Sequence, residues 1–300
     1  MIPNVLSQGG NVKLMNHSFC FYSFFFFGII FARYFLIAGG AYLLFYLVLG
    51  KSLAKRSLRL KPPLSQSIWK DVELSILSAV IFAFCSAFII SEYDLGVTLL
   101  YTDLCEYGLW YLGVSFVAVL ILQDTYFYFM HRMFHHRLLF RWMHFGHHRS
   151  EEPTPWSSFA FDLPEAIVQA LFFIGIVFLV PLHFIALVAL LMTMTIWAML
   201  NHLGFELFPP SFKSHWFGRW FIGATHHSIH HRKYTVHYGL YFTLWDKLLG
   251  TQDPNYENYF HFGNFPVSAT ENEKVLCSHC QRTATNGIQC KGICVADNDY

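Results

Sequence analysis

The chain has 300 residues, of which 55% are hydrophobic and only 13% are charged. Soluble domains carry about twice that proportion of charged residues, so the composition excludes an ordinary soluble domain and favours a protein of the lipid bilayer. The formal net charge of +1 lacks the basic excess that nucleic-acid binding requires, and we expect no nucleic-acid partner.

The first apolar run covers residues 19–49 and is longer than the roughly 20 residues that one membrane crossing needs. An arginine at the bilayer centre costs about 3 kcal/mol, so we place Arg33 at or near a membrane interface. The main crossing is then expected at 34–49, with 19–30 as a separate interfacial or tilted piece. A cleaved signal peptide is the alternative for this stretch, which the further apolar runs downstream disfavour.

Charged residues in the loops indicate on which side of the membrane the next two apolar runs begin and end. Six lysines and arginines lie between residues 51 and 70, and such a cluster beside a span marks the cytoplasmic side. The runs at 72–90 and 109–130 are expected to cross outward and back. The loop between them holds Glu92, Asp94, Asp103 and Glu106 but no lysine or arginine, which suits the outer side.

Two further apolar runs, at 166–180 and 184–200, are expected to form a helical hairpin about a turn at 181–183. The sequence therefore predicts an all-α, multi-pass integral membrane protein with about four transmembrane helices. Its histidine-rich segments all fall on the cytoplasmic side, as a helical cap. The membrane would be the endoplasmic reticulum in a eukaryote, or the plasma or an internal membrane in a bacterium.

Ten of the 17 histidines lie in two short stretches, at 131–148 and 226–231. His131 and His135 are four residues apart and share a helix face. An H-x-x-H-H spacing occurs twice, at 144–148 and at 227–231. Imidazole is the commonest metal ligand among side chains, so this pattern predicts a metal site.

The predicted ligands are His131, His135, His144, His147, His148, His202, His227, His230 and His231. One ion with about four to six coordination positions cannot hold so many imidazoles, so two ions are expected. His202 is included because it follows the hairpin on the same side, with Glu206 four residues later as a further candidate. Asp124 lies on the helix face of His131 and is expected to orient a ligand imidazole through its second nitrogen.

The remaining histidines are not predicted to bind metal. His136 and His226 adjoin the histidine sets but fall off their spacing, and we treat them as doubtful extras. We interpret the others as ordinary polar residues: His17, His183, His215, His237, His261 and His279.

The three histidine sets, HRMFHH, HFGHH and HHSIHH, resemble the histidine boxes of the fatty acid hydroxylase/sterol desaturase superfamily. The flanking residues 153–155 (PTP) and the segment YGLYFTLWDKLLGT at 238–251 resemble its sterol C-5 desaturase (lathosterol oxidase) branch. The likeness covers roughly residues 110–251. The chain departs from that branch between Ser158 and Glu165, where Phe159 and Asp162 stand in place of histidines. This departure weakens the prediction of a sterol substrate and leaves the prediction of the metal site unchanged.

The resemblance implies a non-haem site with two iron ions, O₂ as the oxidant, and electrons from a separate reductase chain. The matching ligand positions are His131, His135, His144, His147, His148, His227, His230 and His231, with His202 as a further candidate. We therefore expect an O₂-dependent membrane oxidoreductase that desaturates or hydroxylates a lipid of sterol or fatty-acyl type.

No glycine-rich nucleotide-binding pattern is present, so electrons are expected from a cytoplasmic carrier of ferredoxin or cytochrome type with its reductase. Four arginines interleave with the histidine sets and could receive an acidic carrier or anchor to lipid headgroups: Arg132, Arg137, Arg141 and Arg149. The alternatives are a zinc-dependent membrane hydrolase and a metal transporter. Metal content distinguishes the hydrolase, and a transporter would need ionisable ligands within its spans.

Three regions are expected along the chain. Residues 1–108 hold the N-terminal spans and loops, 109–263 form the catalytic region, and 264–300 form a polar, flexible tail. The tail contains Cys277, Cys280, Cys290 and Cys294, which are either incidental or part of a small zinc-binding or redox-labile element. The odd total of seven cysteines disfavours a disulfide framework.

Overall fold

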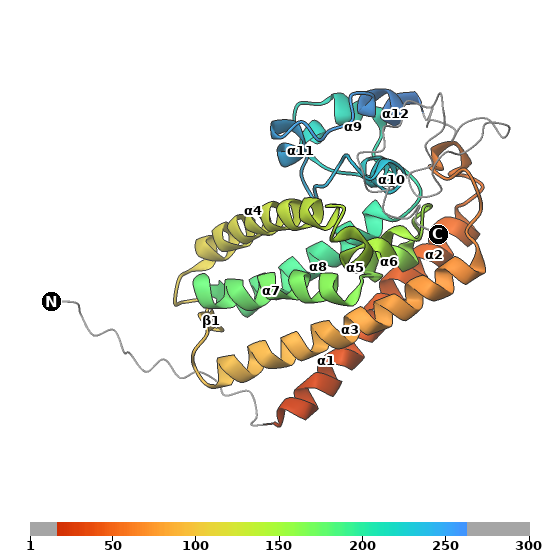
Figure 1. Cartoon of the computed structure of the whole chain (residues 1–300). Helices are drawn as coiled ribbons and strands as arrows, with labels where there is room; N and C mark the ends of the chain where they lie inside the picture. The colour runs from red at the N-terminus through yellow and green to blue at the C-terminus, as the bar shows by residue number, and fades with distance from the viewer. Residues whose placement is uncertain (1–16, 263–300) are drawn as a thin grey trace.

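A computed structural model describes residues 17–262 of the chain (Figure 1). The predictions for the tail at 264–300, including its four cysteines, lie outside the described residues. The N-terminal half contains α1 (Phe19–Tyr34), the π-helix η1 (Phe35–Gly39), α2 (Gly40–Tyr42), the π-helix η2 (Leu43–Val48), η3 (Ala54–Arg56), α3 (Ser65–Asp94), β1 (Leu100–Tyr101), α4 (Leu109–Phe134), α5 (Phe140–Met143) and α6 (Phe145–His148). The C-terminal half contains η4 (Pro155–Phe159), α7 (Leu163–Leu179), β2 (Leu182–His183), α8 (Phe184–Asn201), α9 (Pro210–Ser214), η5 (Gly218–Trp220), α10 (Ala224–Lys233), α11 (Leu244–Leu248) and α12 (Tyr256–Phe262).

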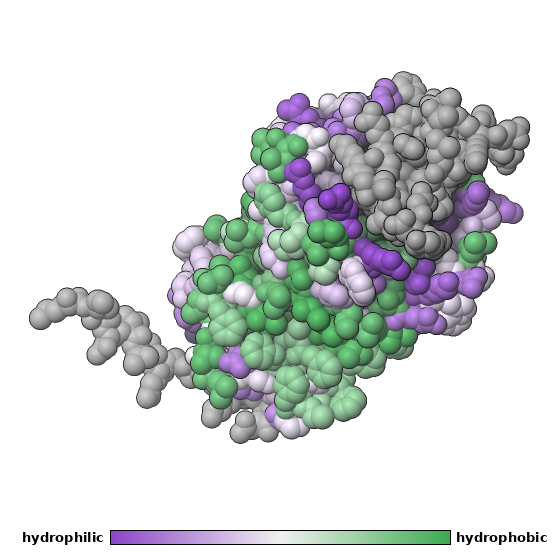
Figure 2. Space-filling model, viewed as in Figure 1, coloured by the Kyte–Doolittle hydropathy of each residue, from purple (hydrophilic) through white to green (hydrophobic). Residues whose placement is uncertain are grey.

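Within the described part of the chain, four helical stretches are long and apolar enough to cross a membrane: Phe19–Val48, Ser65–Asp94, Leu109–Phe134 and Phe184–Asn201. The shorter apolar helix α7 precedes α8 and packs against α3 and α4. The predicted fold class, a helical multi-pass membrane protein with about four spans, is confirmed. Apolar residues cover the helices, whereas hydrophilic residues gather toward the end that carries α10 (Figure 2).

The first apolar run is one continuous helical stretch, so the predicted break at Arg33 is wrong. Helical structure passes from α1 through η1 and α2 to η2, and Arg33 lies near its middle instead of at an end. The stretch is fixed by the loop that follows the second histidine set. The hydroxyl of Tyr34 donates to the carbonyl oxygen of Trp156 at 2.8 Å, and the Trp156 ring lies so close to Gly39 that an added Cβ would be 3.1 Å from it.

Small side chains let α3 pack closely against α1. Ala79, Ala83 and Ala87 recur every four residues and therefore form one stripe on α3. Tyr22 and Ile30 of α1 are buried against this stripe. Such stripes allow helix backbones to approach within a bilayer, where no hydrophobic effect drives helices together. Figure 1 shows the resulting pair of helices along one side of the bundle.

The opposite end of the bundle from α10 is closed by the two strands (Figure 1). β1 and β2 pair in parallel, with Leu100 opposite Leu182, a short exception to the all-α prediction. Gly96 and Gly108 turn the connecting chain with φ angles of 74° and 79°, in the left-handed region that glycine adopts without strain. The C-terminal ends of α4 and α8 consequently point toward α5, α6 and α10.

Candidate metal centre

Nine buried histidines converge at the α10 end of the bundle, in two groups. The first group contains His131, His135, His144, His148 and His230, and the second contains His147, His202, His227 and His231. Within each group the candidate ligand atoms lie within 4.8 Å of one another, and none of these residues is more than 5% exposed. The structure thus brings together all nine histidines predicted as ligands. Their division into two groups suits two ions, and metal binding itself stays a prediction.

Helices of different lengths present several of these rings on shared faces. His131 is in the last turn of α4 and His135 caps its C-terminus, with ring centroids 5.2 Å apart. On α10, the Nε2 atoms of His227 and His231 lie 3.0 Å apart. The N-terminal end of α10 is held by Glu206, whose carboxylate accepts hydrogen bonds from the backbone N–H groups of Thr225 and Phe208. Glu206 is therefore outside both histidine groups and positions α10.

Backbone carbonyls fix the protonation of most of these rings. A carbonyl oxygen only accepts hydrogen bonds, so an imidazole Nδ1 that bonds to one must carry the proton. This holds for His131 to Tyr238 (2.9 Å), His147 to Ala160 (3.2 Å), His202 to Ala198 (2.8 Å), His230 to Val236 (2.7 Å) and His231 to Ser150 (3.1 Å). The Nε2 atoms of these five neutral rings are left with free lone pairs.

These lone pairs point at one another. The Nε2 atoms of His147 and His202 lie 3.3 Å apart, and neither can donate a hydrogen bond because each ring is protonated at Nδ1. The Nε2 of His227 lies 3.0 Å from the Nε2 atoms of both His202 and His231. Buried acceptors that face each other without a donor are costly, and a cation between them removes that cost. The donor set therefore fits metal ions of the kind that imidazole binds.

Burial keeps these imidazoles in their ligand form. It lowers the pKa of His147 to about 4. Burial, followed by repulsion between neighbouring imidazolium charges, also holds the pKa values of a further set well below the usual range: His135, His144, His148, His202, His227 and His231. A lowered pKa means that the neutral ring persists at pH 7, and the neutral ring is the one that binds metal.

Among the described residues, Glu165 and not Asp124 is the carboxylate that hydrogen-bonds to an imidazole of the two groups. Its Oε2 accepts a hydrogen bond from Nδ1 of His144 at 2.7 Å, and the residue is 1% exposed. The expectation that Asp124 orients a ligand imidazole is wrong. Its Oδ1 accepts from the backbone N–H groups of residues 240–242, and so holds the loop whose Tyr238 carbonyl bonds to His131.

A third buried group contains His226, His237 and Asp246. Nε2 of His226 lies 3.3 Å from Oδ2 of Asp246, whose Oδ1 accepts from the backbone N–H of Tyr238. His237 accepts a hydrogen bond at Nε2 from the backbone N–H of Asp253, so its proton is on the Nδ1 atom that would have to bind metal. Asp246 and His237 hold the chain after α10 through backbone hydrogen bonds, whereas neither ring nitrogen of His226 has a hydrogen-bond partner among the described residues. His237 is fully buried, and its description as a residue that binds no metal stays a prediction.

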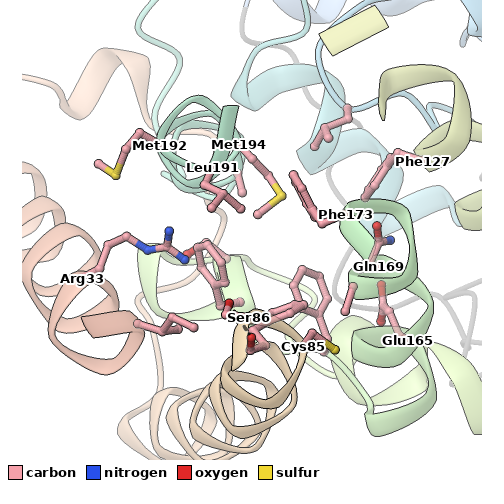
Figure 3. Close-up of a pocket in the computed structure, with 18 of the residues that line it drawn as sticks. Arg33, Cys85, Ser86, Phe127, Glu165, Gln169, Phe173, Leu191, Met192 and Met194 are labelled. Atoms are coloured by element: carbon pink, nitrogen blue, oxygen red, sulfur yellow. Dashed lines mark hydrogen bonds between the residues drawn. The ribbon is translucent and has the colours of Figure 1, made fainter. Parts of the chain in front are cut away.

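An apolar cavity of about 340 Å³ adjoins both histidine groups. Five of the nine histidines line it: His131, His144, His147, His202 and His227. The other walls come from α1, α3, α7 and α8 (Figure 3). Of the two positions that depart from the sterol C-5 desaturase pattern, Phe159 lines this cavity. Asp162 accepts a hydrogen bond from the backbone N–H of Gly146 at 2.6 Å and so anchors α6.

Glu165→Gln is expected to weaken metal binding by about 10- to 100-fold, the usual effect of losing a partner that orients a ligand histidine. The amide keeps the shape of the side chain but replaces the carboxyl group that bonds to Nδ1 of His144. Competition titration with a metal chelator measures this change. Glu73→Gln, on the exposed face of α3, is the matched control. Equal metal affinity in the two variants would remove Glu165 from the metal centre.

Comparison with known proteins places the histidines inside a recognised sequence family. The model of the fatty acid hydroxylase family matches residues 116–251, which include all nine histidines. A second family model, Domain of unknown function (DUF8639), matches residues 254–300. No solved structure matches the chain.

Several curated proteins are similar to the chain. The lathosterol oxidase of Rattus norvegicus is 30% identical over 266 residues, which cover 85% of this chain and 84% of the relative. The lathosterol oxidase of Homo sapiens is 36% identical over 159 residues, 52% of this chain and 51% of the relative. A Delta(7)-sterol 5(6)-desaturase of Gibberella zeae is 33% identical over 156 residues, 52% of this chain and 47% of the relative. The alignments with the human and fungal proteins thus span about half the length of each.

Proposed function

Because this chain belongs to the fatty acid hydroxylase/sterol desaturase family, we propose that it is a membrane oxidoreductase that desaturates or hydroxylates a lipid. The observation that carries the proposal is the pair of buried imidazole groups beside an apolar cavity. Imidazole nitrogens accept iron, and two iron ions bound there would supply the activation of O₂ needed to attack an unreactive C–H bond.

The protein's own residues position the lipid and the histidine rings and exclude water from the cavity. The apolar side chains of α1, α3, α7 and α8 enclose the hydrocarbon body of the lipid, and five histidines border the same space. Glu165 and the backbone carbonyls fix the orientation of the rings through Nδ1. The substrate is of sterol or fatty-acyl type, which agrees with the sterol chemistry named for the relatives.

We place the metal centre on the cytoplasmic side. The basic loop between η2 and α3 packs on the end of the bundle that carries the histidines: the guanidinium of Arg56 donates to the carbonyl of Leu207 at 2.9 Å, and Arg59 donates to that of Pro153 at 3.1 Å. The loop and the histidines therefore lie on one side of the membrane. A cluster of lysines and arginines beside a span favours the cytoplasmic side for both.

An electron carrier is expected to dock on that side. Arg132, Arg137, Arg141 and Arg149 are all exposed around the histidine sets. Together they present positive charge close to the metal centre, which suits an acidic carrier of ferredoxin or cytochrome type served by a reductase.

Reconstitution tests the proposal. The purified chain with bound iron, O₂, NADPH and a membrane lipid extract is expected to oxidise lipid only after a reductase and carrier are added, because the carrier delivers the electrons. Mass spectrometry of the lipids would detect a loss of two hydrogens or a gain of one oxygen. Omission of O₂ is the control and should abolish both changes. Products formed without O₂, or full turnover with NADPH alone, would contradict the proposal.

A further inference from the structure

Arg33 is a cation placed inside an apolar protein layer. It lies near the middle of the helical stretch Phe19–Val48, which is long and apolar enough to cross a membrane. A charged side chain at such a depth is expensive and is kept where it faces the protein interior or a cavity and serves a function. Arg33 lines the apolar cavity, and Figure 3 shows its guanidinium extending from α1 into that space.

Within residues 17–262, no carboxylate pairs with this guanidinium. Among the residues that the structure describes, Arg33 has no hydrogen bond and no ion pair, and its Cζ lies 5.8 Å from the ring centroid of Phe159 in a cation–π contact. An arginine carries five N–H donors in a planar fork, and an aromatic face uses none of them. The donors therefore remain for a ligand in the cavity.

The opposite wall of the cavity belongs to the metal centre. Glu165 and Gln169 of α7 lie across the cavity from Arg33 (Figure 3). Glu165 is already bonded to His144, so it does not neutralise Arg33. Side chains such as Phe173 and Leu191 line the space between the two walls and offer no polar atoms. A ligand with one polar end and an apolar body fits this distribution, its body directed toward the histidines.

We propose that Arg33 binds the oxyanion of an acidic lipid, a carboxylate in the first instance, and so selects acidic over neutral lipids as substrates. The inference rests on the proposed function of the cavity as the lipid site. A carboxylate matches the guanidinium fork with two parallel hydrogen bonds and also compensates its charge. A hydroxyl accepts a hydrogen bond but leaves the charge unbalanced. A sulfate ester shares the oxyanion chemistry and is distinguished below.

Lipid binding tests this selection without turnover. The purified full-length chain with bound metal is titrated with radiolabelled palmitate and with hexadecanol, which share a chain length and differ in the polar end. Arg33→Gln is expected to weaken palmitate binding by about 10-fold or more, and to change hexadecanol binding by less than about 3-fold. Arg33→Lys keeps the charge and loses the planar fork of donors, so it should weaken palmitate binding less than Arg33→Gln does.

Two controls separate selection from folding. Leu36→Met, on the exposed face of the same helical stretch and outside the cavity, conserves volume and should leave both affinities unchanged. Bound metal should stay at the unmodified level in the Arg33 variants, because Arg33 belongs to neither histidine group. Equal weakening of palmitate and hexadecanol, or no weakening of either, would overturn the proposal.

Further measurements identify the oxyanion and distinguish failure of the lipid selection by Arg33 from failure of the proposed function. Binding of cholesterol sulfate, but not of palmitate or cholesterol, in an Arg33-dependent manner would support the oxyanion site and overturn its assignment to a carboxylate. Oxidation of neutral and acidic lipids at equal rates, unaffected by Arg33→Gln, would overturn selection while leaving the proposed function intact. Arg33-dependent palmitate binding by a chain that oxidises no lipid would refute the proposed function alone.

Discussion

His230→Ala is expected to abolish lipid oxidation and to lower the metal affinity of the first group by more than about 100-fold. Loss of a residue that only orients a ligand already lowers metal affinity by about 10- to 100-fold. His230 is fully buried, and its Nε2 lies 3.0 Å from that of His148. His147→Ala should act in the same way on the second group, where only three histidines would remain. Elemental analysis of the purified variants gives metal per chain, beside the rate of lipid oxidation.

His136→Ala is the matched control, because His136 adjoins the first histidine set but is exposed and outside both groups. It should retain metal and activity. His226→Ala is unsuitable as a control, since His226 is buried beside Asp246 and its loss is expected to destabilise the chain after α10. Normal turnover and metal content in His230→Ala would show that the first group is not a metal site.

Eight of the nine histidines could be identified from the sequence because their spacing follows helical periodicity, whereas His202 was identified by its place after the hairpin. Positions i and i+4 share a face whatever surrounds the helix, so His227 and His231 had to lie together, whereas the tertiary fold brings His230 to the other group. The same rule failed for Asp124. It places Asp124 on the face of His131, but the backbone N–H groups of residues 240–242 reach the carboxylate instead. Partners that come from distant segments, such as Glu165 on α7, leave no pattern in local spacing.

Arg33 shows a second limit of sequence patterns. The free-energy cost of an arginine in a bilayer applies to a side chain that faces lipid. When that cost is applied to Arg33, the sequence predicts a position at a membrane interface. In the fold, α1, α3, α7 and α8 surround a cavity, and Arg33 faces it. Which face of an apolar helix is internal depends on the neighbouring helices. A run such as 19–48, apolar on every side, does not reveal that face.

Metal removal followed by replacement tests the identity of the ions and has the second large expected effect. Chelation of the purified chain should abolish lipid oxidation and lower its unfolding temperature, because metal bound only to the folded state stabilises it. The histidines alone do not choose the metal, since all-imidazole sites accept zinc as well as iron. Zn²⁺ should therefore restore the unfolding temperature.

Only Fe²⁺ should restore lipid oxidation, because zinc has no redox chemistry to offer O₂. The Arg33→Gln chain, treated in parallel, should recover its unfolding temperature with either metal, since both histidine groups are intact in it. If Zn²⁺ restored cleavage of ester lipids in the absence of O₂, the zinc hydrolase would replace the oxidoreductase. Zinc held by the same nine buried imidazoles would then act as a Lewis acid on the ester carbonyl, and the apolar cavity would have to admit the water that hydrolysis consumes.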